Sequence, residues 1–422
     1  MAPLIGCVAD DLTGATDLAL ILKRAGCRVV QIIGVPEAGQ AVPDADAIVV
    51  ALKSRTVPAQ AAVAWSLEAL GWLRRAGCRQ HFFKYCSTFD STDQGNIGPV
   101  ADAMMAALGA PVTIACPAFP ENGRSIYQGH LFVGDMLLSD SPMKDHPLTP
   151  MRDSNLVRVL ARQSRSHVGL VPFATVEKGP EAVRAALDAL AAKGPSIAIV
   201  DAITNDHLMT IGAALDGMAL VTGGSGVAMG LPQNFLRARL LEARAAAADF
   251  DPPAGATVML AGSCSAATRG QVEAARAALP SLLLDADALA DDGGIVDEAI
   301  AWARERLAKG PALIYSSADP AVVARIQERH GREHAGAMIE GAFARIAAAL
   351  REAGVTRYIV AGGETSGAVV EALGVNALRI GPEIDPGVPW TTSIGGAPLA
   401  LALKSGNFGA PDFFAKAHGM LP

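Results

Sequence analysis

Short apolar runs alternate with longer amphipathic stretches along most of the chain. The strand-like runs of the first half lie at residues 4–9, 27–33, 47–51, 81–85, 112–116, 168–171 and 196–200. Helical patterns lie between them, the clearest at residues 18–22, 59–76, 100–108 and 180–192. Apolar strands that alternate with amphipathic helices are typical of βαβ units, so the pattern predicts a mostly parallel sheet flanked by helices.

This alternation stops between residues 117 and 150. The segment is rich in Pro, Gly and Asp and has only short apolar pieces. A long segment of this kind inside a compact domain commonly has a function, so we expect a functional loop or a hairpin insertion here.

A second series of strand-like runs begins after a proline-containing linker. The alanine-rich stretch 235–248 is expected to be helical, and the prolines at 252 and 253 then indicate a linker. Further strand-like runs lie at residues 257–261, 281–284, 312–315, 357–361 and 377–380. The chain is therefore predicted to form two α/β domains, residues 1–248 and 256–422, each with a mostly parallel sheet flanked by helices.

Composition and charge exclude several classes of protein. The 422 residues are 51% hydrophobic and 18% charged, as in folded globular chains, and the net charge of −7 argues against nucleic acid as a partner. The six cysteines are scattered without a Cys-x-x-Cys pair, which predicts reduced thiols and a cytoplasmic location. No apolar run has the length of a membrane span, so no membrane partner is expected. Assembly into a homo-oligomer is left open.

Two adjacent carboxylates, Asp10 and Asp11, directly follow the first strand-like run. Ligands of open α/β sheets bind at the carboxyl ends of strands, so this turn lies where chemistry is usually done. Two acids repel each other unless a cation, a substrate hydroxyl or a helix N-terminus compensates. One Asp could simply be a helix N-cap, but a pair followed by Thr13 and Gly14 exceeds what a cap needs.

Basic and polar residues follow the next strands of the first half. Arg55 follows the run 47–51, Lys84 ends the run 81–85 and is followed by Asp90, and Arg124 comes after the run 112–116. Together Arg55, Lys84 and Arg124 would neutralise a carboxylate, while Asp90 would bind hydroxyl groups. Any single arginine of this set is better explained by a surface or structural role. Their repeated position after successive strands favours a binding site.

Three turns rich in Gly and Ser follow apolar runs in the second half, at residues 261–265, 361–367 and 404–409. Strand–turn–helix junctions direct unpaired N–H groups at anions, and glycine permits close approach, so three such turns predict a nucleotide site. A Walker A loop is excluded because the chain has no Gly-Lys dipeptide. The glycines at 224, 226 and 230 miss the dinucleotide spacing, and the histidines do not form a zinc pattern.

At the level of whole motifs, the chain resembles the four-carbon acid sugar kinase family over essentially its full length. The resemblance rests on the motifs at residues 9–15, 83–92, 122–129, 222–226, 262–265, 362–367 and 404–409. It implies a sugar-acid-binding N-terminal domain, a nucleotide-binding C-terminal domain and an active site in the cleft between them. The reaction it implies is ATP-dependent phosphorylation of the terminal hydroxyl of a four-carbon acid, with a 3-oxo-tetronate as the preferred substrate.

The resemblance also assigns residues to the two reactants. The residues expected to contact ATP are Ser263, Gly362, Gly363, Glu364, Thr365 and Gly406. Arg55, Lys84, Asp90 and Arg124 would hold the sugar acid. Asp10 or Asp11 would accept the proton of the attacking hydroxyl, and Mg²⁺ is expected with the nucleotide, on ligands that the sequence does not identify.

Two alternatives to this function stay open. The same motifs fit a kinase for threonate or erythronate, because motifs that mark a family need not separate its substrates. A sensor that binds sugar acids and nucleotides without catalysis is the alternative from another class. The adjacent Asp residues argue against the sensor, since a sensor gains little from two repelling carboxylates.

Overall fold

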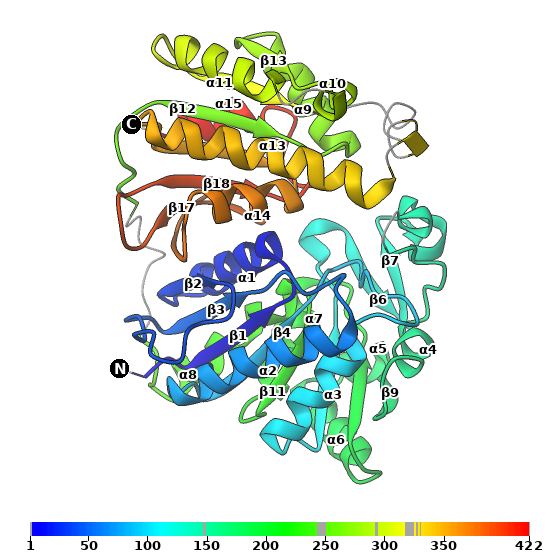
Figure 1. Ribbon diagram of the computed structural model, residues 1–422. Coiled ribbons are helices and arrows are strands. Elements are labelled where there is room, and N and C mark those ends of the chain that lie inside the picture. The colour runs from blue at the N-terminus through cyan, green and yellow to red at the C-terminus, as the bar shows by residue number, and fades with distance from the viewer. Residues whose placement is uncertain are drawn as a thin grey trace. The chain divides into compact units, whose positions relative to one another are not determined.

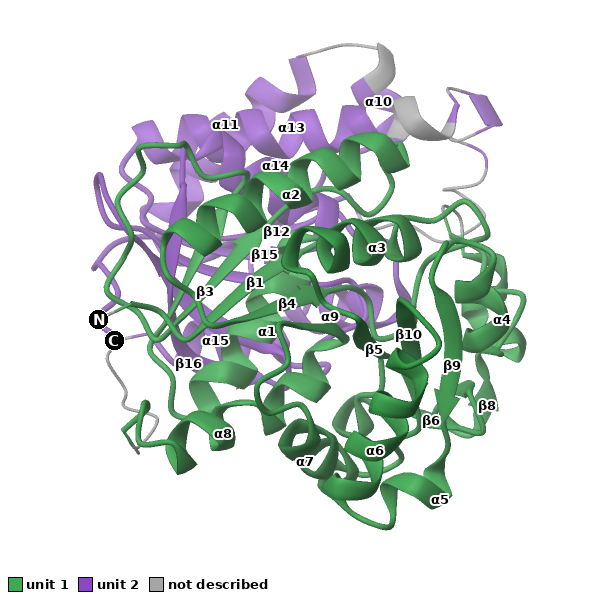
Figure 2. Ribbon diagram, turned by 90° about the horizontal axis from the view of Figure 1, so that it is seen from below, with its two compact units in different colours: residues 1–247 green, residues 248–422 purple. Residues whose placement is uncertain are grey.

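The computed structural model describes residues 2–146, 149–242, 250–291, 294–316, 325, 328–329 and 331–421. The chain divides into two compact units, residues 1–247 and 248–422 (Figure 2). No helix among the described residues is both long and apolar enough to cross a membrane.

Unit 1 contains a parallel sheet in which the chain starts at the centre. The strand order is β2-β3-β1-β4-β11-β5-β10-β9. The strand bounds are β1 Ile5–Ala9, β2 Val29–Ile33, β3 Ala47–Ala51, β4 Gln80–Lys84, β5 Val112–Cys116, β9 His167–Val171, β10 Ser196–Val200 and β11 Leu220–Gly223. Every residue of the central strands β1 and β4 is buried, as expected for a parallel sheet that is covered on both faces.

Helices cover both faces of this sheet. In Figure 2, α2 and α3 lie on one face, and α1, α7 and α8 lie on the other. The helix bounds are α1 Leu12–Arg24, α2 Ala59–Arg75, α3 Ile97–Leu108, α4 Leu156–Ala161, α5 Phe173–Val176, α6 Pro180–Ala191, α7 Asn205–Ala214 and α8 Pro232–Arg237, with a 3₁₀ helix η4 at Ser225–Gly230.

The interrupted segment 117–150 contains the hairpin insertion that the sequence predicts, within its described residues. Strands β6 Arg124–Tyr127, β7 His130–Val133 and β8 Met136–Leu137 form a small antiparallel sheet of their own. Short 3₁₀ turns η1 Pro120–Asn122, η2 Leu138–Asp140 and η3 Pro142–Asp145 flank it.

Unit 2 is a second α/β unit with a mixed sheet (Figure 1). The strand order is β13-β14-β12-β15-β18-β17-β16, and β16 and β17 are antiparallel to their neighbours at one edge. The strand bounds are β12 Thr257–Ala261, β13 Ser281–Leu283, β14 Ala312–Tyr315, β15 Arg357–Ala361, β16 Ala377–Asp385, β17 Val388–Ser393 and β18 Ala400–Lys404. The predicted fold class, two α/β units with mostly parallel sheets, is confirmed.

The core of unit 2 lies between this sheet and two helices from distant parts of the sequence. Side chains of β12 and β15 pack there with Phe413 of α15 and Val272 of α9. Trp390 is fully buried in this core, and its Nε1 donates to the carbonyl of Ala417 at 3.1 Å. The helix bounds are α9 Ala266–Arg276, α10 Ala286–Asp291, α11 Gly294–Leu307, α13 Arg332–Glu352, α14 Gly363–Ala372 and α15 Phe413–Gly419.

Each sheet has a switch point beside its first strand, where the chain first runs towards one edge and then continues on the other side of that strand. In unit 1 the chain moves from β1 towards β3 and β2, then returns to the other side at β4. In unit 2 it moves from β12 towards β14 and β13, then returns at β15. Loops diverge at such a switch point and leave a crevice at the carboxyl ends of the strands, where ligands bind.

Two predicted helices have different bounds in the structure. The helix expected at 235–248 ends at Arg237, because Arg239 adopts a left-handed backbone with φ of 57°. Residues 243–248 of that prediction lie outside the described residues. The helix expected after the turn at 361–367 begins within that turn, at Gly363, so Glu364 and Thr365 belong to its first turn.

The backbones of α7 and η4 approach each other closely at Gly212. A Cβ on Gly212 would overlap the backbone of Gly230, with the carbonyl oxygen at 2.6 Å. We expect Gly212→Ala to lower the free energy of unfolding by about 1–3 kcal/mol, because two backbone segments must separate. Gly71→Ala in α2 should instead raise the free energy of unfolding by about 0.5–1 kcal/mol, because the added Cβ would lie 3.5 Å from the flexible Arg75 side chain and clash with nothing. Urea unfolding of both variants measures this difference, and equal effects would contradict it.

Candidate functional site

The turn between β1 and α1 places Asp10 and Asp11 at the switch point of unit 1. Asp11 is the N-cap of α1, and its Oδ1 accepts from the N–H of Gly14 at 3.1 Å. Its Oδ2 accepts from the hydroxyl of Thr13 at 2.9 Å. The cap that the sequence analysis considered as an alternative is therefore present at Asp11. It does not explain Asp10, whose carboxylate lies outside the cap.

Arg55 joins the two carboxylates. Its Nε and Nη2 donate to the two oxygens of Asp10 at 2.9 and 2.8 Å, and Nη2 also lies 2.6 Å from Oδ1 of Asp11. The loop after β3 is fixed in register, because the N–H groups of Ser54 and Arg55 donate to the carbonyl of Asp10 at 2.9 and 3.2 Å. The buried Asn96 donates to the carbonyls of Ser54 and Arg55 from the other side. A bidentate pair held in this way is rigid and specific.

The two carboxylates differ electrostatically. Burial raises the pKa of Asp10, although Arg55 opposes this effect. Burial acts in the same direction on Asp11, but Arg55, Lys84 and the cap hydrogen bonds outweigh it and lower the pKa of Asp11. The side chain of Asp11 is 23% exposed and that of Asp10 only 7%. Asp11 is therefore the more accessible carboxylate and Asp10 the anchored one.

Asp90 reaches the same group through a strained turn. Phe89 and Asp90 both have positive φ, at 67° and 46°, which is unfavourable for residues with a Cβ. The hydroxyl of Thr88 donates to Oδ1 of Asp90 at 2.7 Å, and Oδ2 lies 3.9 Å from Nη1 of Arg55. Consecutive left-handed residues persist only where the surroundings enforce them, and they are frequent at functional sites.

Lys84 ends β4 beside this group and is buried. Its Nζ donates to the carbonyl of Tyr85 at 2.8 Å. A Cβ on Gly14 would lie 2.9 Å from this Nζ, so the glycine permits the ammonium to approach the first turn of α1. The positive charge of Lys84 stabilises the ionised forms of Asp11 and Asp17.

Asp17 and Ser225 belong to this group but were not singled out from the sequence. Asp17 is buried on α1, and its Oδ2 accepts from the hydroxyl of Ser225 in η4. Within the described residues, its Oδ1 has no hydrogen-bond partner. Burial, partly offset by Lys84 and by the Ser225 hydroxyl, raises the pKa of Asp17 to about 6. The sequence feature that could have indicated Asp17 is its position as a charged residue inside an otherwise apolar helical run.

Arg124, the fourth predicted sugar-acid residue, is not joined to this group by any hydrogen bond or ion pair of the described residues. It begins β6, and its guanidinium donates to the carbonyl of Asn122 in its own turn. Its Nε is buried without a partner in the described part of the chain. Ion pairs with Arg55 thus connect Asp10, Asp11 and Asp90. Lys84 acts on this group through its charge, and Arg124 has no bond to it among the described residues.

The three turns of unit 2 converge at the switch point of that unit. The N–H groups of Gly262 and Ser263, after β12, donate to the carbonyl of Ala361 at 3.1 and 3.3 Å. The N–H of Gly362 donates to the carbonyl of Lys404, at the end of β18, at 2.9 Å. These bonds tie the three turns to one another.

Glycines allow side chains to enter the space between these turns. A Cβ on Gly362 would lie 2.9 Å from Oγ1 of Thr365 and 3.2 Å from the Ser263 nitrogen. A Cβ on Gly406 would overlap Oγ of Ser263. Gly362 also has a φ of 132°, which a residue with a Cβ rarely adopts. The structure therefore brings Ser263, Gly362, Thr365 and Gly406 together.

Gly363 and Glu364 occupy the first turn of α14 next to these residues. Gly362 is the N-cap of this helix and has no side chain with which to cap it. The first N–H groups of a helix lack intrahelical acceptors and attract anions. Glu364 is exposed, so its carboxylate is accessible to solvent at this end of the helix.

The side chains of the described residues do not form a site that would bind a metal ion without the substrate. Within the described ranges, no three His, Cys, Asp or Glu side chains are grouped as metal ligands. The carboxylates of Asp10 and Asp11 have suitable oxygens, but both are bound to Arg55, whose charge repels a cation. Mg²⁺ commonly takes only one or two carboxylates and binds mainly to substrate phosphates.

Comparison with known proteins identifies both units. Residues 5–231 match the model of a sugar-binding N-terminal domain, and residues 258–414 match that of a nucleotide-binding C-terminal domain. The chain belongs to the four-carbon acid sugar kinase family.

Relatives within this family are similar over their whole length. A protein of Burkholderia multivorans named 3-oxo-tetronate kinase is 58% identical over 98% of this chain and 96% of its own. A protein of Pseudomonas fluorescens with the same name is 56% identical over 99% of this chain and 97% of its own. A solved structure from Salmonella typhimurium LT2, named as a candidate tRNA synthase, is 43% identical with a TM-score of 0.88 and covers 99% of both chains.

The contact between Gly406 and Ser263 gives a test of the nucleotide site in this family member. We expect Gly406→Ala to weaken ADP binding by about tenfold, because its Cβ displaces the Ser263 hydroxyl and one contact to an anion is lost. Gly341→Ala in α13 is the matched control, since no atom lies within 4 Å of its added Cβ. Calorimetric titration with ADP measures both variants. Unchanged binding by a folded Gly406→Ala protein would remove this turn from the site.

Proposed function

We propose that the protein is an ATP-dependent kinase that transfers a phosphoryl group to the 4-hydroxyl of 3-oxo-tetronate and forms 3-oxo-tetronate 4-phosphate. The observation that supports this proposal most directly is the full-length similarity to proteins named 3-oxo-tetronate kinase. The domains proposed are residues 1–248 for the sugar acid and residues 256–422 for the nucleotide, in line with the two matched family models.

The acid is proposed to bind in unit 1 at the charge group around Arg55. Arg55, Lys84, Asp90 and Arg124 are the proposed binding residues, and their roles differ. Arg55 is already neutralised by Asp10 and Asp11, so its main role is to hold these carboxylates in place. Asp90, fixed by Thr88, supplies an acceptor for a substrate hydroxyl. Arg124 is proposed for the substrate carboxylate, because its Nε lacks a partner in the described residues.

ATP is proposed to bind in unit 2 at the three turns. Ser263, Gly362, Gly363, Glu364, Thr365 and Gly406 are the proposed contact residues. Backbone N–H groups at the start of α14 and in the turns provide donors for phosphate oxygens without a Walker A sequence. We propose that Mg²⁺ accompanies ATP on the phosphate oxygens, where it supplies positive charge to the transferred group.

Among the two catalytic carboxylates, Asp11 is the one proposed to contact the attacking hydroxyl. It is the more exposed of the two, and it retains acceptor capacity beyond its cap and Arg55 bonds. Its lowered pKa makes it a weak base, but phosphoryl transfer depends more on positioning than on early proton removal. Asp10 is proposed to act through Arg55, which it holds in a bidentate pair.

The cellular location is proposed to be the cytoplasm. All six cysteines are free thiols, and four of them are buried. Free thiols persist in a reducing compartment.

Phosphate transfer to a panel of four-carbon acids tests the function itself. We expect ADP release with 3-oxo-tetronate at a kcat/KM higher than with threonate or erythronate, and a product phosphorylated at the terminal hydroxyl. A preference for threonate or erythronate would assign the chain to the alternative kinase. Binding of both ligands without ADP release would support the sensor instead.

Substitution of the acid pair tests the roles within the site. Asp11→Asn keeps a good N-cap and removes one charge, so stability should change little. We expect kcat to fall by about 10²–10⁴-fold with ADP affinity unchanged, because the hydroxyl loses its charged acceptor. Asp10→Asn should lower stability and raise the KM for the acid, because Arg55 loses its bidentate partner. Asp93→Asn, at an exposed position, is the control for loss of a carboxylate. Near-normal turnover of Asp11→Asn would show that Asp11 serves only as the N-cap of α1.

A further inference from the structure

Lys404 is a fully buried lysine directly beneath the turn at Gly406. It ends β18, and its Nζ lies 2.9 Å from Oγ1 of Thr268, 3.1 Å from the carbonyl of Ser405 and 3.2 Å from the carbonyl of Gly406. Three acceptors around one nitrogen match the three hydrogens of an ammonium group, so this geometry fits the charged form.

The carbonyl of Gly406 is bound by two further donors. The hydroxyls of Ser265 and Thr268 donate to it at 2.5 and 2.8 Å. Ser265 is the N-cap of α9, so its hydroxyl is fixed at the start of that helix. With Lys404, three donors therefore converge on one peptide oxygen, and the peptide between Gly406 and Asn407 can take only one orientation.

The direction of these carbonyls determines the direction of two N–H groups. The C=O and N–H of one trans peptide point in opposite directions, and the described residues include no cis peptide bond. Because the carbonyls of Ser405 and Gly406 point at Lys404, the N–H groups of Gly406 and Asn407 point away from it. Neither N–H has an acceptor among the described residues, and Asn407 is exposed. Two successive free N–H groups form a concavity for an anion.

We propose that Lys404 is a positioning residue that holds the N–H groups of Gly406 and Asn407 towards a phosphate of the bound nucleotide. This inference rests on the proposed nucleotide site and adds the donor atoms and the buried cation that orients them. The phosphate is bound by peptide N–H groups, and Lys404 acts on it through the turn and through its charge.

Stability alone does not explain a lysine at this position. Taking an ammonium out of water is costly, and an apolar side chain of similar volume in a buried site is often neutral or stabilising. The Phe413 ring, whose centroid lies 5.8 Å from Nζ, also attracts a cation, but such a contact offsets only a small part of the desolvation cost. A function for the charge explains why a lysine rather than an apolar residue occupies this position.

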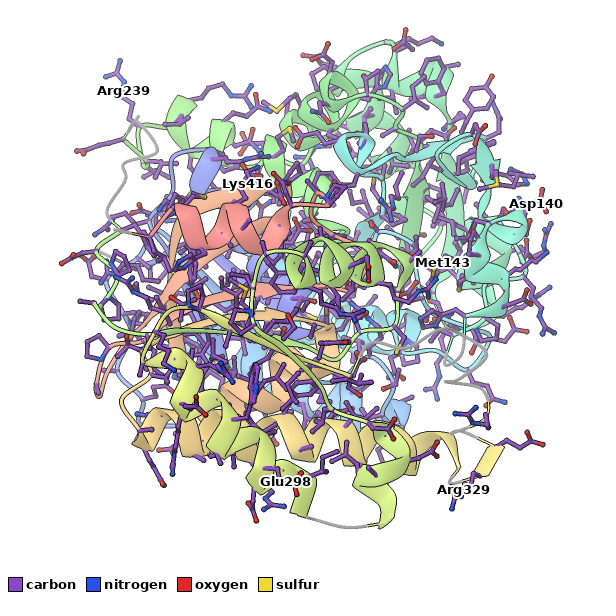
Figure 3. All side chains as sticks on the ribbon, turned by 90° about the horizontal axis from the view of Figure 1, so that it is seen from above. Asp140, Met143, Arg239, Glu298, Arg329 and Lys416 are labelled. Carbon is purple, nitrogen blue, oxygen red and sulfur yellow. The ribbon has the colours of Figure 1, made fainter. Side chains whose placement is uncertain are left out.

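The charge of Lys404 depends on pH within the range of enzyme assays. Burial lowers its pKa to about 7, and Asp385 on β16 opposes this shift. Asp385 is itself paired at 2.6 Å with Lys416, which Figure 3 labels on α15, and it accepts from the N–H of Ala410 at 2.9 Å. The other groups near Nζ are the neutral Thr268, the two turn carbonyls and the Phe413 ring. The amine therefore loses its proton, and one of its three bonds, as pH rises through about 7.

The first experiment compares ADP with adenosine, which has no phosphate. We expect Lys404→Met to bind ADP about tenfold or more weakly and adenosine as the wild type does, because only phosphate uses the two N–H groups. The exposed Lys309→Met is the matched control for loss of a lysine in unit 2. Equal losses for ADP and adenosine, or no loss for either, would overturn the inference. A wild type that does not bind ADP would overturn the proposed function and this inference with it.

The second experiment removes one N–H group directly. Asn407→Pro deletes the N–H, whereas Asn407→Ala keeps it and deletes only the side chain. We expect ADP binding to be weaker in the Pro variant than in the Ala variant, with equal binding of adenosine. Equal ADP binding by the two variants would overturn the inference. This test does not depend on Lys404→Met, so it also applies where that variant does not fold.

The third readout is the pH dependence of the wild type relative to Lys404→Met. The ADP affinity of the wild type divided by that of Lys404→Met should fall as pH rises from about 6 to about 8.5. Only the wild type loses a charge at residue 404 over this range. Titration of the ADP phosphates affects both proteins and cancels in the ratio. A ratio that does not change with pH would contradict a role for the charge.

Discussion

The ion pair of Arg55 with the adjacent carboxylates of Asp10 and Asp11 is the interaction on which unit 1 depends. The carboxyl ends of parallel strands expose peptide groups and gather polar side chains, and β1 ends there with two negative charges. Without a cation, burial would protonate one of them. Arg55 reaches both because its own loop is tied to the carbonyl of Asp10, so the backbone geometry and the charge balance enforce each other.

Unit 2 has the opposite polarity at the carboxyl ends of its parallel strands. A buried cation, Lys404, lies at the end of β18, and its partners are neutral oxygens rather than carboxylates. Carbonyl groups directed inwards leave N–H groups directed outwards, which is the polarity that phosphate requires. One unit therefore presents acceptors that suit hydroxyl groups, and the other presents donors that suit anions.

Much of this arrangement follows from sequence, because strand ends in α/β proteins are marked by an abrupt change from apolar to polar residues. The turns at Asp10 and at Ser263 could be placed in this way, and so could their position at carboxyl ends. Asp17 and Lys404 were not assigned a role from the sequence. Asp17 lies within an apolar helical run, Lys404 is only the first residue of its predicted turn, and tertiary contacts alone show what each of them binds. β17 was missed because Pro389 interrupts its pattern, and proline in a run argues against a strand. The separation of Arg124 from the other sugar-acid residues was also invisible, since a loop position fixes no side-chain direction.

The charge balance of unit 1 constrains the orientation of an acidic substrate. The carboxylates of Asp10, Asp11, Asp17 and Asp90 lie in one group with the cations Arg55 and Lys84, and Arg24 also acts on Asp17. At neutral pH Asp17, with a pKa of about 6, is mostly ionised, so the group has an excess of negative charge. A substrate carboxylate placed against it would be repelled, whereas a hydroxyl can donate to it. The hydroxyl end of a four-carbon acid therefore suits this group, and its carboxylate requires a cation farther along the site, which is the role that a separate Arg124 can fill.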